Sequence, residues 1–143
     1  MLVGNVMAKS TTSLQPTTTI LGAAKLMAKS KVGILPVVDE GGIVGVVTDR
    51  DITIRGVAAG LDPETPVSRI MSRDVSVCDE NTPVGTVLDQ MAREGRRRIP
   101  VRSAEGKIVG VVSLADAARA YDDRIKVMAV FNKVFAPGGG QTG

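Results

Sequence analysis

The sequence has no histidine, no tryptophan and one cysteine, Cys78, among 143 residues. A single cysteine cannot form an intramolecular disulfide. Without histidine, the chain lacks the residues on which zinc fingers, Cys/His nucleophile pairs, Ser-His-Asp triads and most transition-metal sites depend. Aromatic residues make up only 2% of the chain, so few side chains can stack on single-stranded nucleic acid. These absences disfavour most enzyme classes.

Long apolar runs and strong charge are missing as well. No stretch reaches the roughly 18 apolar residues of a membrane-spanning helix, and the first residues do not resemble an export signal. The formal net charge is +3 and is not concentrated on one helix that could read a DNA groove. We therefore expect a cytoplasmic protein with no membrane segment and with nucleic acid as a disfavoured partner.

A tandem repeat is what the sequence does contain. Val6-Met7 recurs as Ile70-Met71 at a spacing of 64 residues, and "IVGVVT" (43–48) recurs as "IVGVVS" (108–113) at a spacing of 65. The second copy therefore holds one extra residue. We divide the chain into repeat 1 (1–60), a linker (61–66), repeat 2 (67–121), a C-terminal helix (122–136) and a disordered tail (137–143).

Each copy shows the same change of periodicity along the chain. Apolar residues at helical spacing come first, then two short β-branched runs, then a second helix that begins near Asp49 or Ala115. Thr18 and Thr82 suit the N-cap of the first helix, and Pro83 suits its first helical position. "DEGG" (39–42) predicts a hairpin turn between the strands. These patterns predict an α+β fold of two helix-strand-strand-helix repeats.

The strands of both copies are apolar on two faces, so each small sheet needs a cover on both sides. Helices cover one side, and the sheet of the other copy is the natural cover for the second. We therefore expect the repeats to pack face to face about a pseudo-twofold axis, with two equivalent clefts between them.

The order helix, [L/I]-P-V, G-h-V-[T/S]-x-x-D (h is an apolar residue) resembles the CBS domain, and its duplication resembles a CBS pair, or Bateman module. The resemblance reaches to about Tyr121. The run "TDRDITIRGVAAGLDP" (48–63) is similar to the small stand-alone bacterial CBS-pair proteins. Members of that group can carry zinc, but with no histidine and one cysteine we expect no metal here.

The motif places Asp51 and Asp116 three residues after Thr48 and Ser113, where a strand meets a helix. Backbone donors in the first turn of a helix favour anions, and the hydroxyl adds a donor. An aspartate nearby can accept hydrogen bonds from ribose hydroxyls. The alternative is that both aspartates only cap their helices.

The family resemblance implies adenosine ligands: AMP, ADP or ATP, and less often S-adenosylmethionine or a dinucleotide such as NAD. It also implies that each cleft combines the aspartate of one copy with residues of the other. For the Asp116 cleft the residues are Val111, Ser113, Asp116, Val32 and Gly33. For the Asp51 cleft they are Val46, Thr48, Asp51, Ser76 and Arg96.

The triplet Arg96-Arg97-Arg98 has Lys31-Val32-Gly33 as its counterpart, so it distinguishes the two copies. Arg97 fits a position that in the family often carries a phosphate-binding basic residue. We therefore expect the phosphate-rich ligand at Asp116 and weaker binding at Asp51, unless Arg50 or Arg55 supplies the charge. The alternative is that the triplet is a solvated face.

These patterns together predict a non-catalytic sensor that binds adenine nucleotide and signals to a separate effector protein. We expect a homodimer through the helices near residues 23–27 and 87–91. The alternatives are a nucleic-acid module that uses Arg96–Arg98, or a purely structural dimerisation module. An enzyme is disfavoured, because no histidine is present to activate Ser113.

Three further expectations concern single residues and the end of the chain. Cys78 is expected to be an inert core residue, and Met7, Met27, Met71 and Met91 are expected to fill the core. The helix at 122–136 either closes the core or dimer, which we favour, or docks a partner protein.

Overall fold

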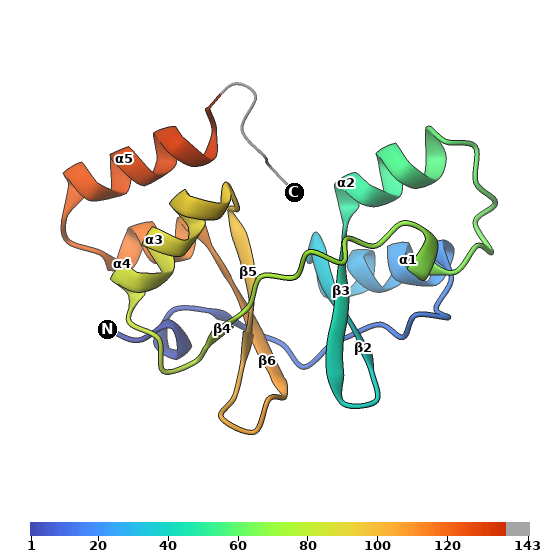
Figure 1. Ribbon diagram of the computed structural model, residues 1–143, viewed down its shortest axis with the longest axis horizontal. Helices are drawn as coiled ribbons and strands as arrows, with labels where there is room; N and C mark the ends of the chain where they lie inside the picture. Colours follow the sequence, from blue (N-terminus) through green and yellow to red (C-terminus); the bar gives the residue numbers. More distant parts are fainter. Residues whose placement is uncertain (137–143) are drawn as a thin grey trace. The chain divides into compact units, whose positions relative to one another are not determined.

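The computed structural model describes residues 1–136; the tail expected at 137–143 lies outside the described residues. The chain forms two compact units. The first-repeat unit is Thr12–Val75. The second-repeat unit combines Met1–Thr11 with residues 76–136 (Figure 1). Residues 1–11 thus belong structurally with the second repeat, although they precede the first.

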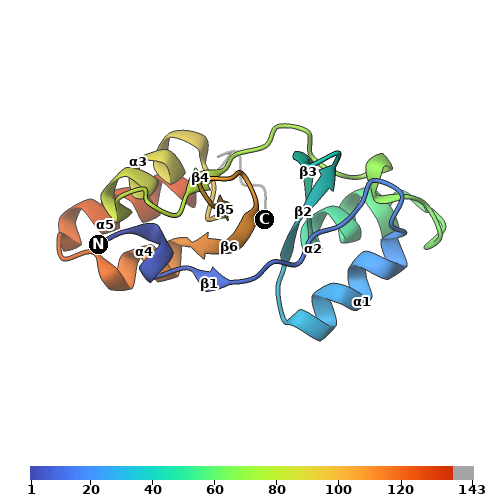
Figure 2. The same ribbon diagram turned by 90° about the horizontal axis from the view of Figure 1, so that it is seen from below.

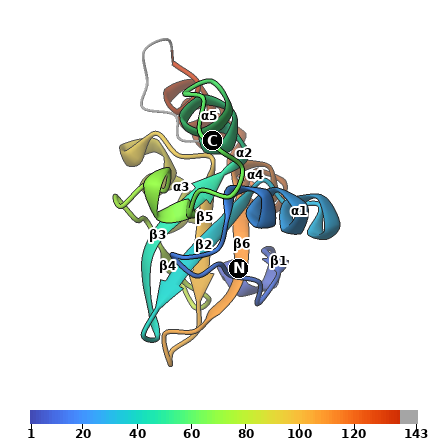
Figure 3. The ribbon, with the colours of Figure 1, turned by 90° about the vertical axis from the view of Figure 1, so that its right-hand side faces the viewer.

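The first-repeat unit consists of one helix, one hairpin and a short irregular helix. Its elements are α1 (Ile20–Ser30), β2 (Ile34–Asp39), β3 (Gly42–Thr48), α2 (Asp49–Asp51), a π-helical turn (Ile52–Val57) and a 3-10 turn (Val67–Arg69). β2 and β3 form a two-stranded antiparallel sheet (Figure 3). Glu40 and Gly41 connect them with positive φ at both positions, 50° and 82°, which a type I′ turn requires. The predicted hairpin is confirmed.

The second-repeat unit is built on a four-stranded sheet. In chain order its elements are a 3-10 turn (Val3–Asn5), β1 (Ala8–Lys9), β4 (Cys78–Asp79), α3 (Val84–Glu94), β5 (Arg98–Arg102), β6 (Ile108–Ser113), α4 (Leu114–Ala120) and α5 (Arg124–Val134). The strand order is β1-β6-β5-β4, and only the β4–β5 pair is parallel. Figure 2 shows β1 beside β6.

The segments that lead into the two repeats are exchanged between the units. Ala8 pairs with Val111 on β6, and its counterpart Ser72 pairs with Val46 on β3. Fully buried Val3 belongs to the second-repeat core, and fully buried Val67 to the first-repeat core. Each core is therefore completed by residues that precede the other repeat in the sequence.

Gly45 on β3 and Gly110 on β6 make room for the exchanged segments. A Cβ atom on Gly110 would lie 2.5 Å from the carbonyl oxygen of Ala8, and one on Gly45 would lie 2.9 Å from that of Ser72. Real Cβ atoms do not approach so closely. The glycine in each "IVGVV" run is thus required by the backbone that packs across it.

The predicted helix starts are wrong by one residue. The N-caps of α1 and α3 are Thr19 and Pro83, not Thr18 and Thr82. Thr18 and Thr82 turn their hydroxyl oxygens upstream, where they accept from the backbone N–H groups of Gln15 and Asp79. Such local turns compete with capping, so each helix begins one position later.

The extra residue of the second copy lies in its hairpin loop. Two residues separate the last β2–β3 pair, Asp39 and Gly42, whereas three separate Ser103 from Lys107, whose backbones are hydrogen-bonded. Gly106, with φ of 82°, closes the longer loop. The change of spacing from 64 to 65 is therefore absorbed at a turn and leaves the strands in equivalent register.

The cores are aliphatic and include the residues expected there. Met27, Met71 and Met91 are buried, and Met7 packs against the second-repeat core. Cys78 is buried, and its burial raises the pKa of its thiol to about 12; it is an inert core residue. Within residues 1–136, no helix is both long and apolar enough to cross a membrane.

The C-terminal helix packs on the second-repeat core, and the residues expected at a dimer surface are buried. Val130 and Val134 of α5 are buried in the second-repeat core, so this helix does close its unit. Ala23, Met27, Val87 and Met91 are buried within their own units, so these side chains offer no surface to a second copy. The homodimer itself stays a prediction.

Candidate functional site

The two strand-to-helix junctions have the same local geometry. The backbone N–H of Thr48 donates to Oδ2 of Asp51 at 2.9 Å, and the N–H of Asp51 donates to Oγ1 of Thr48 at 3.1 Å. Ser113 and Asp116 repeat both bonds at 3.1 and 3.0 Å. Each pair is a capping box. The capping role considered for the two aspartates is thus confirmed in both copies.

Capping uses only one oxygen of each carboxylate. Oδ1 of Asp116 accepts from Nη2 of Arg119 at 2.8 Å, and Arg119 is largely exposed. Oδ1 of Asp51 lies 3.9 Å from Nε of Arg55. The hydroxyls of Thr48 and Ser113 accept one N–H each and keep a proton to donate. Thr48 is 2% exposed, whereas Ser113 is only half-buried, so the second junction is the more accessible one.

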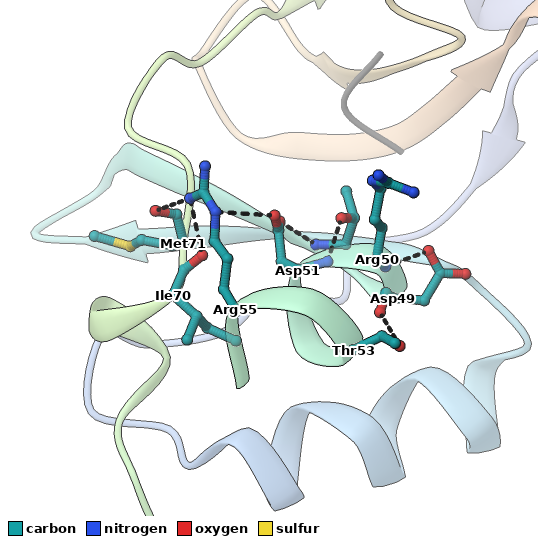
Figure 4. Close-up of polar contacts among 8 residues, drawn as sticks. Asp49, Arg50, Asp51, Thr53, Arg55, Ile70 and Met71 are labelled. Carbon is teal, nitrogen blue, oxygen red and sulfur yellow. Dashed lines mark hydrogen bonds and ion pairs between the residues drawn. The ribbon is translucent and has the colours of Figure 1, made fainter. Parts of the chain in front are cut away.

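Arg55 serves the first-repeat unit itself. Its Nη1 donates to the carbonyl oxygens of Ile70 and Met71 at 3.3 and 3.5 Å, while its Nε faces Asp51 (Figure 4). The arginine therefore joins the capping box to the exchanged segment. Arg50 is exposed and points away from Asp51 in the same view. Of the two arginines considered for this junction, Arg55 is held by its own unit.

The loop before each hairpin is bonded to the junction of its own repeat. The carbonyl oxygen of Gly33 accepts from the N–H of Asp49 at 2.9 Å, and that of Arg97 accepts from Leu114 at 2.7 Å. Arg97, which is exposed, is thereby fixed beside Ser113. The backbone of Arg97 therefore lies next to the Asp116 junction, and its expected role in phosphate binding stays a prediction.

The eleven predicted nucleotide-binding residues divide between the units. The first-repeat unit contains Val32, Gly33, Val46, Thr48 and Asp51, and the second-repeat unit contains Ser76, Arg96, Arg97, Val111, Ser113 and Asp116. Val46 and Val111 occupy equivalent places on β3 and β6. The pairing of each set with residues of the other repeat stays a prediction.

Ser76 and Arg96 are buried rather than presented on a surface. The Ser76 hydroxyl lies 2.6 Å from Oε1 of Glu94 and accepts from Nε2 of Gln90 at 2.8 Å. No sequence pattern had indicated this hydrogen-bond network. Arg96 is 8% exposed and Arg98 is half-buried, so the expectation of a solvated face at Arg96–Arg98 is wrong for Arg96. The triplet is not a continuous basic surface.

A hollow of about 410 Å³ opens beside the second junction. It brings together two predicted residues, Arg97 and Ser113, with residues that were not predicted. The complete lining is Arg97, Arg98, Ser113, Leu114, Ala115, Ala118, Phe131 and Phe135. Phe131 lies on α5, and Phe135 directly follows that helix. This segment carries more apolar residues than the single apolar stripe that packs on a core. That surplus was the available sequence signal.

The first junction has a smaller and more polar counterpart. A hollow of about 320 Å³ is lined there by Asp49, Arg50, Thr53 and Ile54. At the spacing of 65 residues, Arg50 and Thr53 replace Ala115 and Ala118. Among residues 1–136, no group of three or more cysteine or acidic side chains is placed to hold a metal ion.

Comparison with known proteins gives a family match in both repeats. The CBS domain model matches residues 3–55 and 67–123. The CBS domain-containing protein YhcV of Bacillus subtilis is 37% identical over 116 residues, covering 81% of this chain and 82% of that protein. Hypoxic response protein 1 of Mycobacterium tuberculosis is 41% identical over 103 residues, covering 71% of each chain.

Solved structures share the fold. Hypoxic Response Protein I, solved with two coordinated zinc ions, superposes with a TM-score of 0.73 at 33% identity, over 85% of this chain and all of that one. CBSX2 in complex with AMP superposes with a TM-score of 0.66 at 26% identity, over 83% of this chain and 94% of that one. The CBS domain pair of protein MJ0100 was solved in complex with 5′-methylthioadenosine and S-adenosyl-L-methionine. It superposes with a TM-score of 0.70 at 29% identity, over 84% of this chain and 94% of that one.

Proposed function

Because the chain belongs to the CBS-domain family and carries two copies of that domain, we propose that it is a non-catalytic regulatory module. It binds an adenosine-containing ligand, AMP, ADP or ATP, and transmits the bound state to a partner protein. The observation that carries this proposal is the pair of related structures, at 26% and 29% identity, with AMP or with 5′-methylthioadenosine and S-adenosyl-L-methionine bound.

The second junction is the primary site of the proposal. Oδ1 of Asp116 accepts from the ribose hydroxyls once exposed Arg119 moves aside, and the Ser113 hydroxyl donates to a ligand oxygen. Arg97 neutralises phosphate. Charge-assisted hydrogen bonds of about 1.5–3 kcal/mol each are compatible with micromolar to millimolar dissociation constants.

The first junction is the weaker site of the same proposal. Thr48, which carries its hydroxyl, is 2% exposed, and Arg55 is bonded to two backbone carbonyls. The nucleic-acid alternative has less support, because Arg96 is buried and its triplet is not a continuous basic surface. We therefore rank nucleotide binding first.

The test separates the two oxygens of Asp116. Asp116 is the N3 residue of the capping box, where an uncharged amide can also accept from the N-cap N–H. Asp116→Asn therefore keeps one carbonyl oxygen for the N–H of Ser113 but replaces the other acceptor by an NH₂ group. AMP, ADP, ATP, S-adenosylmethionine and NAD are titrated calorimetrically against the wild type and this variant. We expect affinity for the preferred ligand to fall about 10- to 100-fold.

Asp51→Asn is the matched control, because it makes the same change in the other capping box. It should weaken that ligand less than Asp116→Asn does. Urea unfolding should show both variants destabilised by a similar amount, up to about 1 kcal/mol, because each loses one negative charge from the first turn of a helix. Unchanged affinity in both variants would leave the aspartates with the capping role alone.

A further inference from the structure

The two phenylalanines of the chain lie in one place. Phe131 and Phe135 are one helical turn apart, and their ring centroids are 4.6 Å apart with the rings inclined at 37°. The sequence has only these two phenylalanines, one tyrosine and no tryptophan. Two of its three aromatic side chains therefore line the hollow beside Ser113.

Neither ring is used to build the core. The buried stripe of α5 is formed by Val130 and Val134, whereas Phe131 and Phe135 are 47% and 37% exposed. Exposed aromatic rings leave apolar area in water, which a flat apolar ligand group would cover. Ala115 and Ala118 of α4 also line the hollow, and their small side chains take up little of its space.

The polar groups of the hollow fit the rest of a nucleotide. Ser113 contributes a half-buried hydroxyl, and Arg97 contributes an exposed cation. An aromatic wall, a hydroxyl and an arginine in a volume of about 410 Å³ suit a ligand that joins a planar base to an anionic group. The counterpart at the first junction lacks an aromatic lining residue.

We infer that Phe131 and Phe135 pack against the purine base of the ligand, which makes the second junction the one that selects a base. This inference rests on the proposed function and adds α5 to its site. The base enters between α5 and α4, the ribose lies at Ser113 and Asp116, and the phosphate meets Arg97. The polar first junction has no equivalent base site, so one ligand binds tightly per chain.

Calorimetry with AMP and with ribose 5-phosphate tests the inference, because the two differ by the base alone. Phe131→Ala and Phe135→Ala should each lower AMP affinity about tenfold and leave the weaker binding of ribose 5-phosphate unchanged. Ile125→Ala is the control: Ile125 is on the same helix, is 85% exposed and does not line the hollow. It should bind AMP as the wild type does.

A second readout uses the absence of tryptophan. Phe131→Trp places the sole tryptophan in the hollow, and AMP should change its fluorescence whereas ribose 5-phosphate should not. Ala118→Leu should fill the hollow and lower AMP affinity without altering either ring.

The outcomes separate this inference from the proposed function. AMP binding that is lost in Asp116→Asn but kept in both phenylalanine variants would overturn the role of the rings and leave the nucleotide site intact. If the phenylalanine variants lose as much affinity for ribose 5-phosphate as for AMP, the rings support the fold of the site and do not contact the base, and the inference fails. No binding of any adenosine compound to the wild type at millimolar concentration would overturn both.

Discussion

Asp51 and Asp116 show how one side chain can be assigned two roles from sequence. Both cap a helix through Oδ2, and both keep Oδ1 outside the capping box. The proposed contact with ribose uses Oδ1, so capping and ligand binding do not compete for the same atom. Replacement by alanine would remove both functions together, which is why asparagine is the informative substitution.

Cys78 provides a prediction about pH. Burial raises the pKa of its thiol from an ordinary value near 9 to about 12. Between these values the folded protein keeps the proton that the unfolded chain releases, so the free energy of unfolding decreases as pH rises above 9. By pH 10 the loss due to this residue should reach about 1 kcal/mol.

The measurement is urea unfolding of the wild type and Cys78→Ala at pH 8 and pH 10. The variant is less stable at both values because it loses core packing. Its further decrease between pH 8 and pH 10 should nevertheless be smaller than that of the wild type. An equal decrease in the two proteins would show that the thiol does not contribute.

At the scale of elements, the backbones that pack closely against Gly45 on β3 and Gly110 on β6 lead to a second prediction. Gly110→Ala places Cβ against the Ala8 carbonyl, so β1 must move away from β6. Overpacking of this kind costs about 1–3 kcal/mol. We expect Gly110→Ala to lower the free energy of unfolding by about 2 kcal/mol, and Gly45→Ala to lower it less, because its closest neighbour is the flexible Met71 side chain.

Gly42→Ala is the control for both glycine variants. Gly42 lies on β3, and an added Cβ would meet only the Asp39 carbonyl oxygen, at 3.9 Å. Thermal unfolding should place it close to the wild type. If Gly110→Ala is as stable as Gly42→Ala, the packing of β1 against β6 is not tight in solution.

The elements that the sequence predicted are those with a local cause. The hairpin followed from "DEGG", and both first helices followed from apolar spacing. The helix starts were missed because Thr18 and Thr82 bond upstream, a choice that their residue type does not reveal. The π-helical turn at Ile52–Val57 and the two-residue strand β1 were missed as well. Long-range pairing decides such short elements more than local propensity does.

The same division applies to the candidate site. The repeated motif located Ser113 and Asp116, because capping and ligand contact both require those residue types at that spacing. Phe131 and Phe135 were missed, because their apolar positions also fit a helix that only closes the core. Ser76 was predicted to line the Asp51 cleft, but its hydroxyl is hydrogen-bonded to Gln90 and Glu94 on α3.

At the scale of the whole molecule, the exchanged segments predict which unit a core substitution weakens. Val3 and Val67 are both fully buried, each in the unit that contains the other repeat. Truncation to alanine should cost about 1–3 kcal/mol in each case. Val3→Ala should lower amide hydrogen-exchange protection in α3, β5 and β6, and Val67→Ala should lower it in α1, β2 and β3.

The two variants are controls for each other, since they make the same change at equivalent positions. If Val3→Ala instead lowered protection in β2 and β3, the strands of the repeat that follows Val3 in the sequence, the exchange of segments would be contradicted. The repeat boundaries at residues 60 and 67 could not reveal this arrangement, because sequence similarity aligns Val3 with Val67 without saying which core either enters.

Gly45 and Gly110, over which the exchanged segments pack, have an implication for how such a chain arose. A single copy of the repeat could fill the space over its glycine only with the leading segment of another polypeptide, so its folding would depend on protein concentration. Joining two copies in one polypeptide supplies both segments at a fixed effective concentration. Dilution then no longer weakens the exchange, which makes duplication followed by fusion the route that this packing favours.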